Sequence, residues 1–188
     1  MQTINVVSAA HHLLIQKIKH SQRILDATAG NGNDTLFLAE HSPATAEIYA
    51  FDIQQHALDV TKQKLQEQGL LKKVRLILAS HDQVNQYVEE PIDIVMFNLG
   101  YLPGGDHTLT TDAKTTISAL EKTMALLNIN GIISITAYRG HQAGCIEHQQ
   151  LANLLMNLPM RNFTVSCYSM VNHLETSPVL YLIEKVRS

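Results

Sequence analysis

The chain has 188 residues, of which 45% are hydrophobic, and a formal net charge of −3 with histidine neutral. This length and apolar content predict a single folded domain over residues 1–188 and exclude a disordered chain. The slightly acidic balance argues against a broad phosphate-binding surface. There is no apolar run of membrane-spanning length, no signal-peptide pattern and no zinc-type spacing, and the two cysteines are expected to be free thiols, so we expect a cytoplasmic protein with no membrane or metal partner.

Hydrophobic periodicity and turn residues divide the chain into alternating helices and strands. The first predicted helix is capped by Ser8, and the strand at 92–97 is nearly all apolar, as expected for a strand buried on both faces. In chain order, the predicted elements are a helix at 8–20, a strand at 23–28, a helix at 34–40, a strand at 47–51, a helix at 54–68, a strand at 74–78, a short helix through 88, a strand at 92–97, a helix at 110–127, a strand at 131–138 that follows a turn at 128–131, a helix at 147–157, and strands at 163–168 and 179–186.

This order predicts an α/β, Rossmann-like fold with a mostly parallel seven-stranded sheet and helices on both faces. The last two strands have no helix between them, so we expect them to pair antiparallel. In doubly wound sheets, ligands bind beyond the carboxyl ends of the parallel strands. The unusual segments of this chain all fall at such ends, which predicts one active-site cleft built from residues 26–34, 52–54, 80–82, 98–107 and 138–144.

The turn D-A-T-A-G-N-G-N-D at 26–34 links the first strand directly to a helix and is typical of a nucleotide-binding loop. Gly30 and Gly32 lack a Cβ, so the backbone can adopt positive φ and approach a ligand closely. Asn31 and Asn33 offer donors and acceptors to the amino acid part of a ligand, and capping of the helix is the alternative.

Acidic side chains indicate which ligand this turn accepts. Asp34, at the start of the helix, would repel a pyrophosphate, and Thr35 stands where the dinucleotide fingerprint requires its third glycine. Asp52 ends the second strand and is placed to accept hydrogen bonds from ribose hydroxyls. Asp26 either accepts from an amino group of the ligand or serves as a buried structural cap. The combination resembles the S-adenosylmethionine site of class I methyltransferases.

Two further segments supply candidate cofactor contacts. Gln54 is expected to hydrogen-bond the ribose or adenine, with a plain helix-start role as the alternative. Ser80 and His81 follow the third strand, where this architecture contacts the adenine edge. Capping of the following helix by Ser80 is compatible with that role.

The segment F-N-L-G-Y-L-P-G-G-D at 97–106 follows the central strand and resembles the N-P-P-Y motif of amino methyltransferases. In those enzymes the Asn side chain and a backbone carbonyl accept hydrogen bonds from the target amine, while the aromatic ring packs nearby. Asn98 and Tyr101 are therefore candidate catalytic residues. A leucine and a glycine replace the two prolines, which weakens the case for a planar base amine as the target. A simple connecting loop is the alternative.

The loop at 137–144 carries aromatic and basic side chains together with two glycines at the end of the fifth predicted strand. We take Tyr138, Arg139 and His141 as candidate substrate-binding residues. A lone histidine is more often structural than catalytic, so contact with substrate is favoured over chemistry at His141.

Together, the segments at 26–39, 51–54, 80–82, 97–106 and 138–144 make nearly the whole chain resemble the YtqB-like rRNA methylase family. The resemblance implies an S-adenosylmethionine-dependent methyltransferase that acts on the wobble uridine of tRNA, at the 5-aminomethyl group of 2-thiouridine 34. The implied partner is tRNA through its anticodon region, and a homodimer is allowed. The resemblance places cofactor contacts at Asn31, Asn33, Asp52, Gln54, Ser80 and His81.

Other functions stay open on the sequence. A small-molecule or rRNA methyltransferase would use the same cofactor site, and a catalytically silent module would keep the cofactor without the reaction. An NAD-dependent oxidoreductase is a distant fourth. A target alkylamine must lose a proton before it attacks, because ammonium groups of this kind are protonated at neutral pH. Asp106 or His107 is a candidate for relaying that proton.

Overall fold

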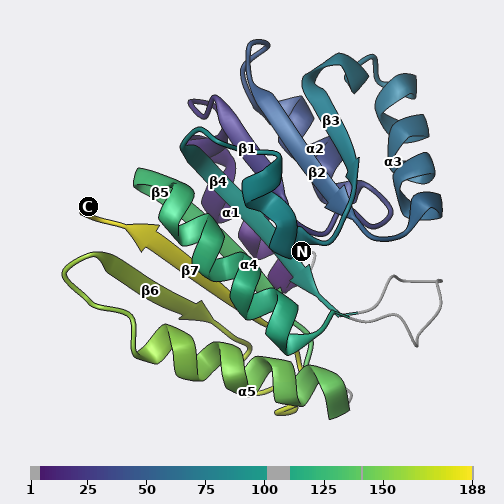
Figure 1. The fold of residues 1–188 in the computed structure, drawn as a ribbon. Helices are drawn as coiled ribbons and strands as arrows, with labels where there is room; N and C mark the ends of the chain where they lie inside the picture. Colours follow the sequence, from purple (N-terminus) through teal and green to yellow (C-terminus); the bar gives the residue numbers. More distant parts are fainter. Residues whose placement is uncertain (1–4, 101–110, 141, 188) are drawn as a thin grey trace.

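The structure, a computed structural model, describes residues 5–100, 111–140 and 142–187, and its seven strands form one mixed sheet (Figure 1). The strands are β1 (Arg23–Asp26), β2 (Glu47–Asp52), β3 (Val74–Leu78), β4 (Ile92–Leu99), β5 (Leu127–Ala137), β6 (Phe163–Tyr168) and β7 (Val179–Lys185). Their order across the sheet is β3-β2-β1-β4-β5-β7-β6. The candidate residue Tyr101, with Asp106 and His107, and the candidate His141 lie outside the described residues.

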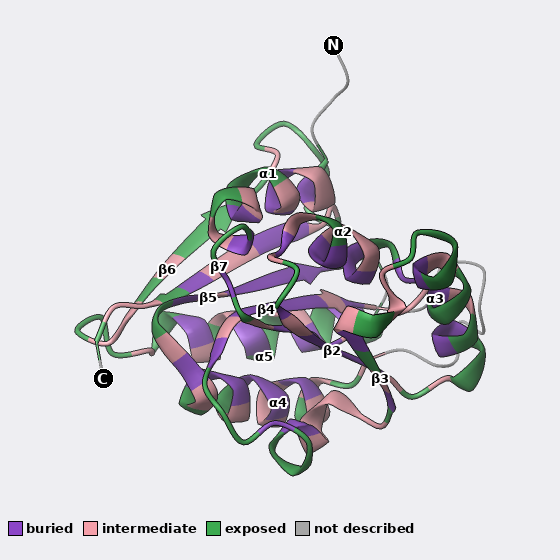
Figure 2. Cartoon of the chain, turned by 90° about the horizontal axis from the view of Figure 1, so that it is seen from above, coloured by how far each residue is buried: buried purple, intermediate pink, exposed green. Residues whose placement is uncertain are grey.

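Helices cover both faces of this sheet. They are α1 (Val6–Ile18), α2 (Asn33–His41), α3 (Gln55–Glu67), α4 (Ala113–Leu126) and α5 (Gln142–Met156), with short 3-10 helices η1 (Leu71–Lys73) and η2 (His81–Gln86). Seen from above, α1, α2 and α3 lie on one face, and α4 and α5 lie on the other (Figure 2). Within the described ranges, no helix combines the length and apolar character needed to cross a membrane.

The strand pairing confirms the predicted α/β class. β1 pairs in parallel with β2 and β4, β2 pairs in parallel with β3, and β4 pairs in parallel with β5. β7 is antiparallel to both of its neighbours, β5 and β6, which confirms the antiparallel pairing expected for the last two strands. The connections from β1 and β2 use helices on one face, whereas the connection from β4 uses α4 on the other. The sheet therefore has its topological switch point between β1 and β4, where doubly wound sheets bind ligands.

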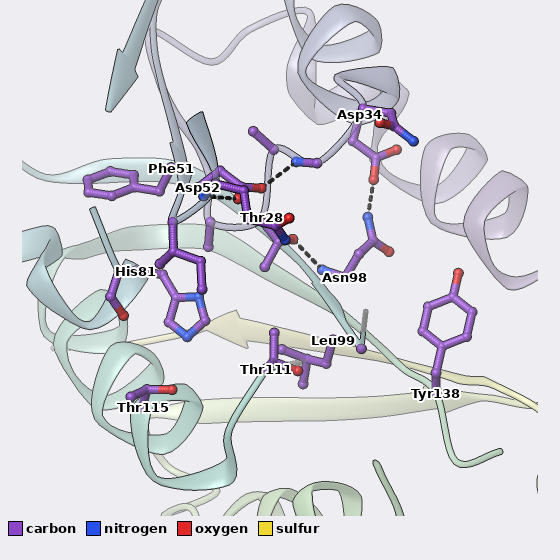
Figure 3. A pocket seen from close by; sticks show the side chains of 18 of the residues that line it. Thr28, Asp34, Phe51, Asp52, His81, Asn98, Leu99, Thr111, Thr115 and Tyr138 are labelled. Carbon is purple, nitrogen blue, oxygen red and sulfur yellow. Dashed lines mark hydrogen bonds between the residues drawn. The ribbon is translucent and has the colours of Figure 1, made fainter. Parts of the chain in front are cut away.

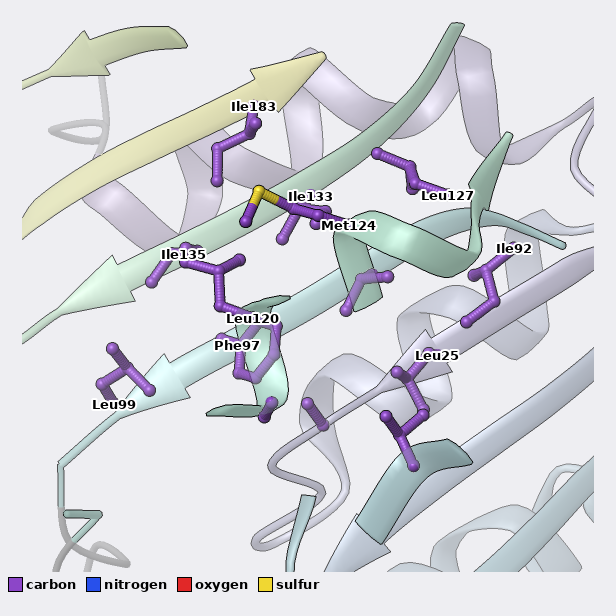
Figure 4. Packing of buried hydrophobic residues seen from close by; sticks show 14 of the residues in the cluster. Leu25, Ile92, Phe97, Leu99, Leu120, Met124, Leu127, Ile133, Ile135 and Ile183 are labelled. Atoms are coloured by element: carbon purple, nitrogen blue, oxygen red, sulfur yellow. The ribbon is translucent and has the colours of Figure 1, made fainter. Parts of the chain in front are cut away.

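The central strands are buried on both sides, which explains why they read as apolar runs and not as alternating patterns. Successive residues of a strand point to opposite faces. In β1, Ile24 packs on the side of α1 to α3, while Leu25 packs on the side of α4 and α5. Phe97 of β4 joins Leu25 in the second layer, together with Leu120 of α4 (Figure 4). The two cores hold the carboxyl ends of β1 and β4 side by side.

The predicted cap of the first helix is wrong. The helix begins at Val6, and its N-cap is Asn5, whose Oδ1 accepts a hydrogen bond from the Ser8 backbone N–H at 2.8 Å. Ser8 lies inside the first turn, where its hydroxyl donates back to the Asn5 carbonyl at 3.0 Å. Both residue types are good caps, so propensity alone did not separate them.

The fifth strand begins four residues earlier than predicted. The segment expected as a turn at 128–131 belongs to β5, and the ladder with β4 shifts register after the pair formed by Ile92 and Leu127. Asn130 has a φ of 62°, so the irregularity is a bulge that a left-handed asparagine allows. α4 begins at Ala113 because Asp112 caps it.

Lys73 ties the end of α2 to the start of β3. Its Nζ donates to the carbonyl of Ala39 at 2.6 Å and to the carbonyl and hydroxyl oxygens of Ser42 at 3.0 Å and 2.9 Å. We expect Lys73→Met to lower the free energy of unfolding by about 1–2 kcal/mol, because these bonds to a charged donor are lost in a partly exposed site. The neighbouring Lys72 is exposed, so Lys72→Met is the matched control. Equal denaturation midpoints for the two variants would contradict this role.

Candidate active site

A cavity of about 840 Å³ opens beyond the carboxyl ends of β1, β2, β4 and β5, at the switch point of the sheet (Figure 3). Its volume is typical of a site for a cofactor-sized ligand. The structure brings most of the predicted site residues together there, whereas Asp26 and Arg139 do not line the cavity. The predicted residues that line it are Gly30, Asn31, Asn33, Asp52, Gln54, Ser80, His81, Asn98 and Tyr138.

The glycine turn adopts the predicted backbone and is held from behind by α3. Gly30 and Gly32 have φ values of 51° and 75°, and Gly32 is the N-cap of α2. A Cβ at Gly32 would lie 2.6 Å from the Thr61 Oγ1 and 2.9 Å from the Thr61 Cα. The second contact is with the backbone, which cannot move aside as a flexible side chain can, so a larger residue does not fit here. The same Thr61 hydroxyl donates to the Gly30 carbonyl at 3.0 Å. The turn is thus a rigid cradle with backbone groups on the cavity side.

Asp52 joins the cradle to the end of β2. Its Oδ2 accepts from the Gly30 backbone N–H at 2.8 Å, and its Oδ1 accepts from the Gln54 backbone N–H at 2.9 Å. A carboxylate offers about four acceptor sites, so two lone pairs stay available on the cavity side. Two neighbouring acceptors of this kind match the two hydroxyls of a ribose. Gln54 occupies the N-cap position of α3 without a capping side-chain bond, and its side chain lines the cavity.

His81 presents a buried ring nitrogen to the same cavity. Its Nε2 is buried and has no hydrogen-bond partner in the described structure, and the ring stands edge-on to Phe97 with a centroid separation of 5.8 Å. Burial lowers the pKa of His81, which favours the neutral ring. A buried nitrogen without a partner fits a ligand with polar edges, such as adenine. Ser80 occupies the N-cap position of η2, as the alternative role required, but its side chain makes no capping hydrogen bond.

Asn98 and Tyr138 form the other end of the cavity (Figure 3). The Asn98 backbone N–H donates to the Thr28 Oγ1 at 2.7 Å, which joins the ends of β4 and β1. The Asn98 side-chain amide donates to the Asp34 carboxylate. Burial, and after it the charge of Asp34, raises the pKa of Tyr138, so this phenol is neutral at neutral pH. The cavity therefore has a polar end where an amide and a phenol lie close to a carboxylate.

The contacts of Asp26 match the structural alternative considered for it. Its carboxyl is fully buried and accepts from the Thr28 backbone N–H at 3.1 Å and from the Thr35 hydroxyl at 2.6 Å. Burial, and after it the charge of Asp34, raises the pKa of Asp26 to about 7. A carboxyl that is half protonated near neutral pH supports the turn from below and does not face the cavity.

The raised pKa of Asp26 makes stability depend on pH. Between its ordinary value of 3.8 and about 7, the unfolded chain binds fewer protons than the folded protein, so the free energy of unfolding falls as pH rises. Asp26→Asn removes this contribution and resembles the protonated carboxyl. We expect the variant to gain stability relative to wild type from pH 4 to 7, by roughly 1.4 kcal/mol per unit of pKa shift. Urea denaturation across this range tests it, with the exposed Asp59→Asn as control; parallel curves for Asp26→Asn and wild type would contradict it.

Arg139 lies at the end of β5 but turns away from the cavity. Its Nε and Nη2 both donate to the Ser177 carbonyl, at 2.9 Å and 2.7 Å, so the guanidinium ties this loop to the segment before β7. The Arg139 carbonyl accepts from the exposed Cys145 thiol at 3.0 Å. Cys145 and Cys167 are both free, as expected.

The cavity also contains residues that sequence reasoning missed as site residues. Thr28 and Asp34 belong to the motif at 26–34, and their position in this motif could have identified them as site residues. Thr115 comes from the first turn of α4, Thr111 lies just before that helix, and Val7 comes from α1. Nothing in the local pattern of those two helices indicates that they reach the switch point, because their positions depend on how the sheet is covered.

The Rossmann-like fold and the cradle at its switch point define an S-adenosylmethionine-dependent methyltransferase. The family model described as "Putative rRNA methylase" matches residues 48–184. The chain belongs to this rRNA methylase family.

Known relatives agree with this class. The chain is 34% identical over 186 residues, 94% of its length and 68% of the relative's, to the protein of Arabidopsis thaliana named tRNA (mnm(5)s(2)U34)-methyltransferase, chloroplastic. The crystal structure of a Clostridium thermocellum protein described as "putative rRNA-methylase" superposes with a TM-score of 0.94 at 37% identity, covering 98% of this chain and all of that one. SMU.1697c of Streptococcus mutans, described as "a putative methyltransferase" and solved in complex with SAH, superposes with a TM-score of 0.88 at 38% identity, covering 98% of this chain and 99% of that one. S-Adenosylmethionine is accordingly the cofactor.

Proposed function

We propose that this enzyme methylates the nitrogen of the 5-aminomethyl group of uridine or 2-thiouridine at the wobble position of tRNA. The observation that carries the proposal is Asn98, whose side-chain amide lies at the polar end of the cavity, directly beyond the central strand. An amide oxygen there is an acceptor for an amine N–H. The name of the Arabidopsis relative supports a wobble uridine as the bearer of that amine.

The cofactor would lie along the cavity from the cradle to His81. We assign the methionine end to Gly30, Asn31 and Asn33, which line the cavity at the glycine turn. Asn33 is oriented for this by Lys64, whose Nζ donates to its Oδ1 at 2.7 Å and leaves its amide N–H groups for the ligand. The ribose is assigned to Asp52 and Gln54, and the adenine to Ser80 and His81. Bound S-adenosylmethionine supplies a methyl group that is already activated by its sulfonium.

The remaining residues position the nucleophile. Asn98 Oδ1 and the Leu99 carbonyl are assigned to accept the amine N–H bonds, and Tyr138 is assigned to stack on the uracil ring, as unpaired bases are commonly held. Alignment of an amine lone pair with the bond to be broken can account for roughly 7–11 kcal/mol of the barrier. We keep Tyr101 as a candidate catalytic residue and His141 as a candidate substrate contact, while Arg139 ties the end of β5 to the segment before β7.

The proposal is tested with bulk RNA from a strain that lacks the enzyme. Purified protein and labelled S-adenosylmethionine are expected to methylate the tRNA fraction, and nucleoside analysis is expected to show loss of 5-aminomethyl-2-thiouridine with gain of its methylated product. Label in rRNA alone would favour an rRNA methyltransferase. Label in neither RNA, with cofactor binding intact, would favour a small-molecule substrate or a silent module. We also propose a cytoplasmic location, as expected from the sequence.

A further inference from the structure

Asp34 connects α1 to the polar end of the cavity. Its carboxylate, in the first turn of α2, is 7% exposed and bonds two side chains from other elements. One oxygen lies 2.6 Å from the Nε2 of His11 on α1, and the other accepts from the Nδ2 of Asn98 at the end of β4 (Figure 3). Three distant parts of the chain therefore meet at one carboxylate beside the assigned position of the target amine.

This carboxylate fixes the orientation of the Asn98 amide. An ionised carboxylate only accepts hydrogen bonds, so the NH₂ of Asn98 must face Asp34. The amide oxygen of Asn98 is then the group left to face the substrate. Without Asp34 the amide would be free to rotate by 180° and present a donor, which an amine lone pair would bind unproductively.

His11 is held so that it can exchange protons with Asp34. Its ring stacks on Phe37 of α2 with a centroid separation of 3.7 Å and an interplanar angle of 5°. The side chain is 23% exposed, so the pair has a route to solvent while Asp34 remains buried. Imidazole is the side chain that gains and loses a proton most readily near neutral pH. His81, in contrast to His11, lies at the opposite end of the cavity, which is assigned to the adenine (Figure 3).

We infer that His11 and Asp34 form a proton-accepting pair for the target ammonium, and that Asp34 also sets the orientation of Asn98. The inference rests on the proposed function. The ammonium first loses one proton to the pair, which passes it to solvent through His11. The neutral amine nitrogen then forms the N–C bond with its lone pair, as the C–S bond breaks and its electron pair stays on sulfur. The product leaves as a secondary ammonium, so protons and charge balance.

Other titratable groups lie near the pair formed by His11 and Asp34, and their effects on the pH profile must be separated from the effect of the pair. The buried Asp26 of β1 and Tyr138, which follows β5, both interact electrostatically with Asp34. His41, at the end of α2, packs against the Phe37 ring with a centroid separation of 4.6 Å. Asp26→Asn, Tyr138→Phe and His41→Gln therefore belong in the same pH series, so that a changed profile can be attributed to the correct group.

The test measures single-turnover methylation of an anticodon stem-loop RNA that carries 5-aminomethyl-2-thiouridine, from pH 6 to 9.5. We expect His11→Gln and Asp34→Asn to lower the rate at pH 7 by about 100-fold, the usual effect of losing a general base. The deficit should shrink as pH approaches the ammonium pKa of about 10, because the amine then loses its proton without help. Affinity for S-adenosylhomocysteine should change by less than about threefold, which also shows that the variants fold.

The matched control is the adjacent histidine of the same helix. His12 is exposed, and its Nδ1 bonds the Ser8 carbonyl at 2.7 Å, so His12→Gln should match wild type at every pH. A deficit of equal size at all pH values, no deficit, or a tenfold loss of S-adenosylhomocysteine affinity in Asp34→Asn would each overturn the proton role while wild type remains active. A wild-type protein that methylates no amine in this RNA would instead overturn the proposed function, and this inference with it.

Discussion

Replacing Asn98 with alanine is expected to reduce the rate of methyl transfer to tRNA by about 100-fold or more, because the amine loses an acceptor that aligns its lone pair. The loss should appear in kcat and not in cofactor binding, since the Asn98 side chain lies at the end of the cavity opposite His81 (Figure 3). Single-turnover rates and calorimetry with S-adenosylhomocysteine separate the two quantities.

Asn153→Ala is the control for this variant. Asn153 is exposed on α5, so the same substitution there changes helix surface without touching the cavity. If Asn98→Ala methylated tRNA at the wild-type rate, the amide would have no part in positioning the amine. If the variant lost methylation and S-adenosylhomocysteine affinity together, Asn98 would belong to the cofactor site.

The second large effect is expected at Asp52. Asp52→Ala should weaken S-adenosylhomocysteine binding by about 100-fold or more, because bonds to a charged acceptor contribute about 1.5–3 kcal/mol each and the ribose would lose two. The variant also frees the backbone N–H groups of Gly30 and Gln54, so the cradle itself loses order. Titration calorimetry measures the change directly.

Asp59→Ala separates the specific role from the loss of one negative charge. Asp59 is exposed on α3, where its carboxylate accepts only from the neighbouring Gln55 side chain among the described contacts. We expect its affinity for S-adenosylhomocysteine to equal that of wild type. An Asp52→Ala protein that binds as tightly as this control would contradict the assignment of the ribose.

The sheet and the cofactor end of the site could be predicted because their signals are local. The glycine turn, the acidic strand end at Asp52 and the polar pair after β3 each follow one strand, and parallel strands bring their carboxyl ends to one edge. The antiparallel last pair followed from the missing helix between two strands. These features depend on chain order and backbone chemistry, which the sequence displays directly.

At the polar end of the site, Asn98 and Tyr138 each lie at the carboxyl end of a strand and could be predicted in the same way, but the contacts of Asp34 could not. His11 reaches Asp34 only because α1 packs beside α2, a contact between residues 23 positions apart that leaves no periodic trace. The sequence marks Asp34 as a charge that excludes pyrophosphate, yet its hydrogen bond to Asn98 depends on the position of β4. The place of Arg139 in a loop predicts a substrate contact, whereas its Nε and Nη2 donate to the Ser177 carbonyl before β7.

The most direct measurement uses S-adenosylmethionine with a deuterated methyl group and a synthetic anticodon stem-loop that carries 5-aminomethyl-2-thiouridine at position 34. Tandem mass spectrometry of the digested RNA locates the transferred group. We expect one deuterated methyl on the side-chain nitrogen of that nucleoside, and no transfer to a stem-loop that carries unmodified uridine there. A label on a ribose oxygen or on a ring atom, or no label from a protein that demonstrably binds the cofactor, would contradict the account.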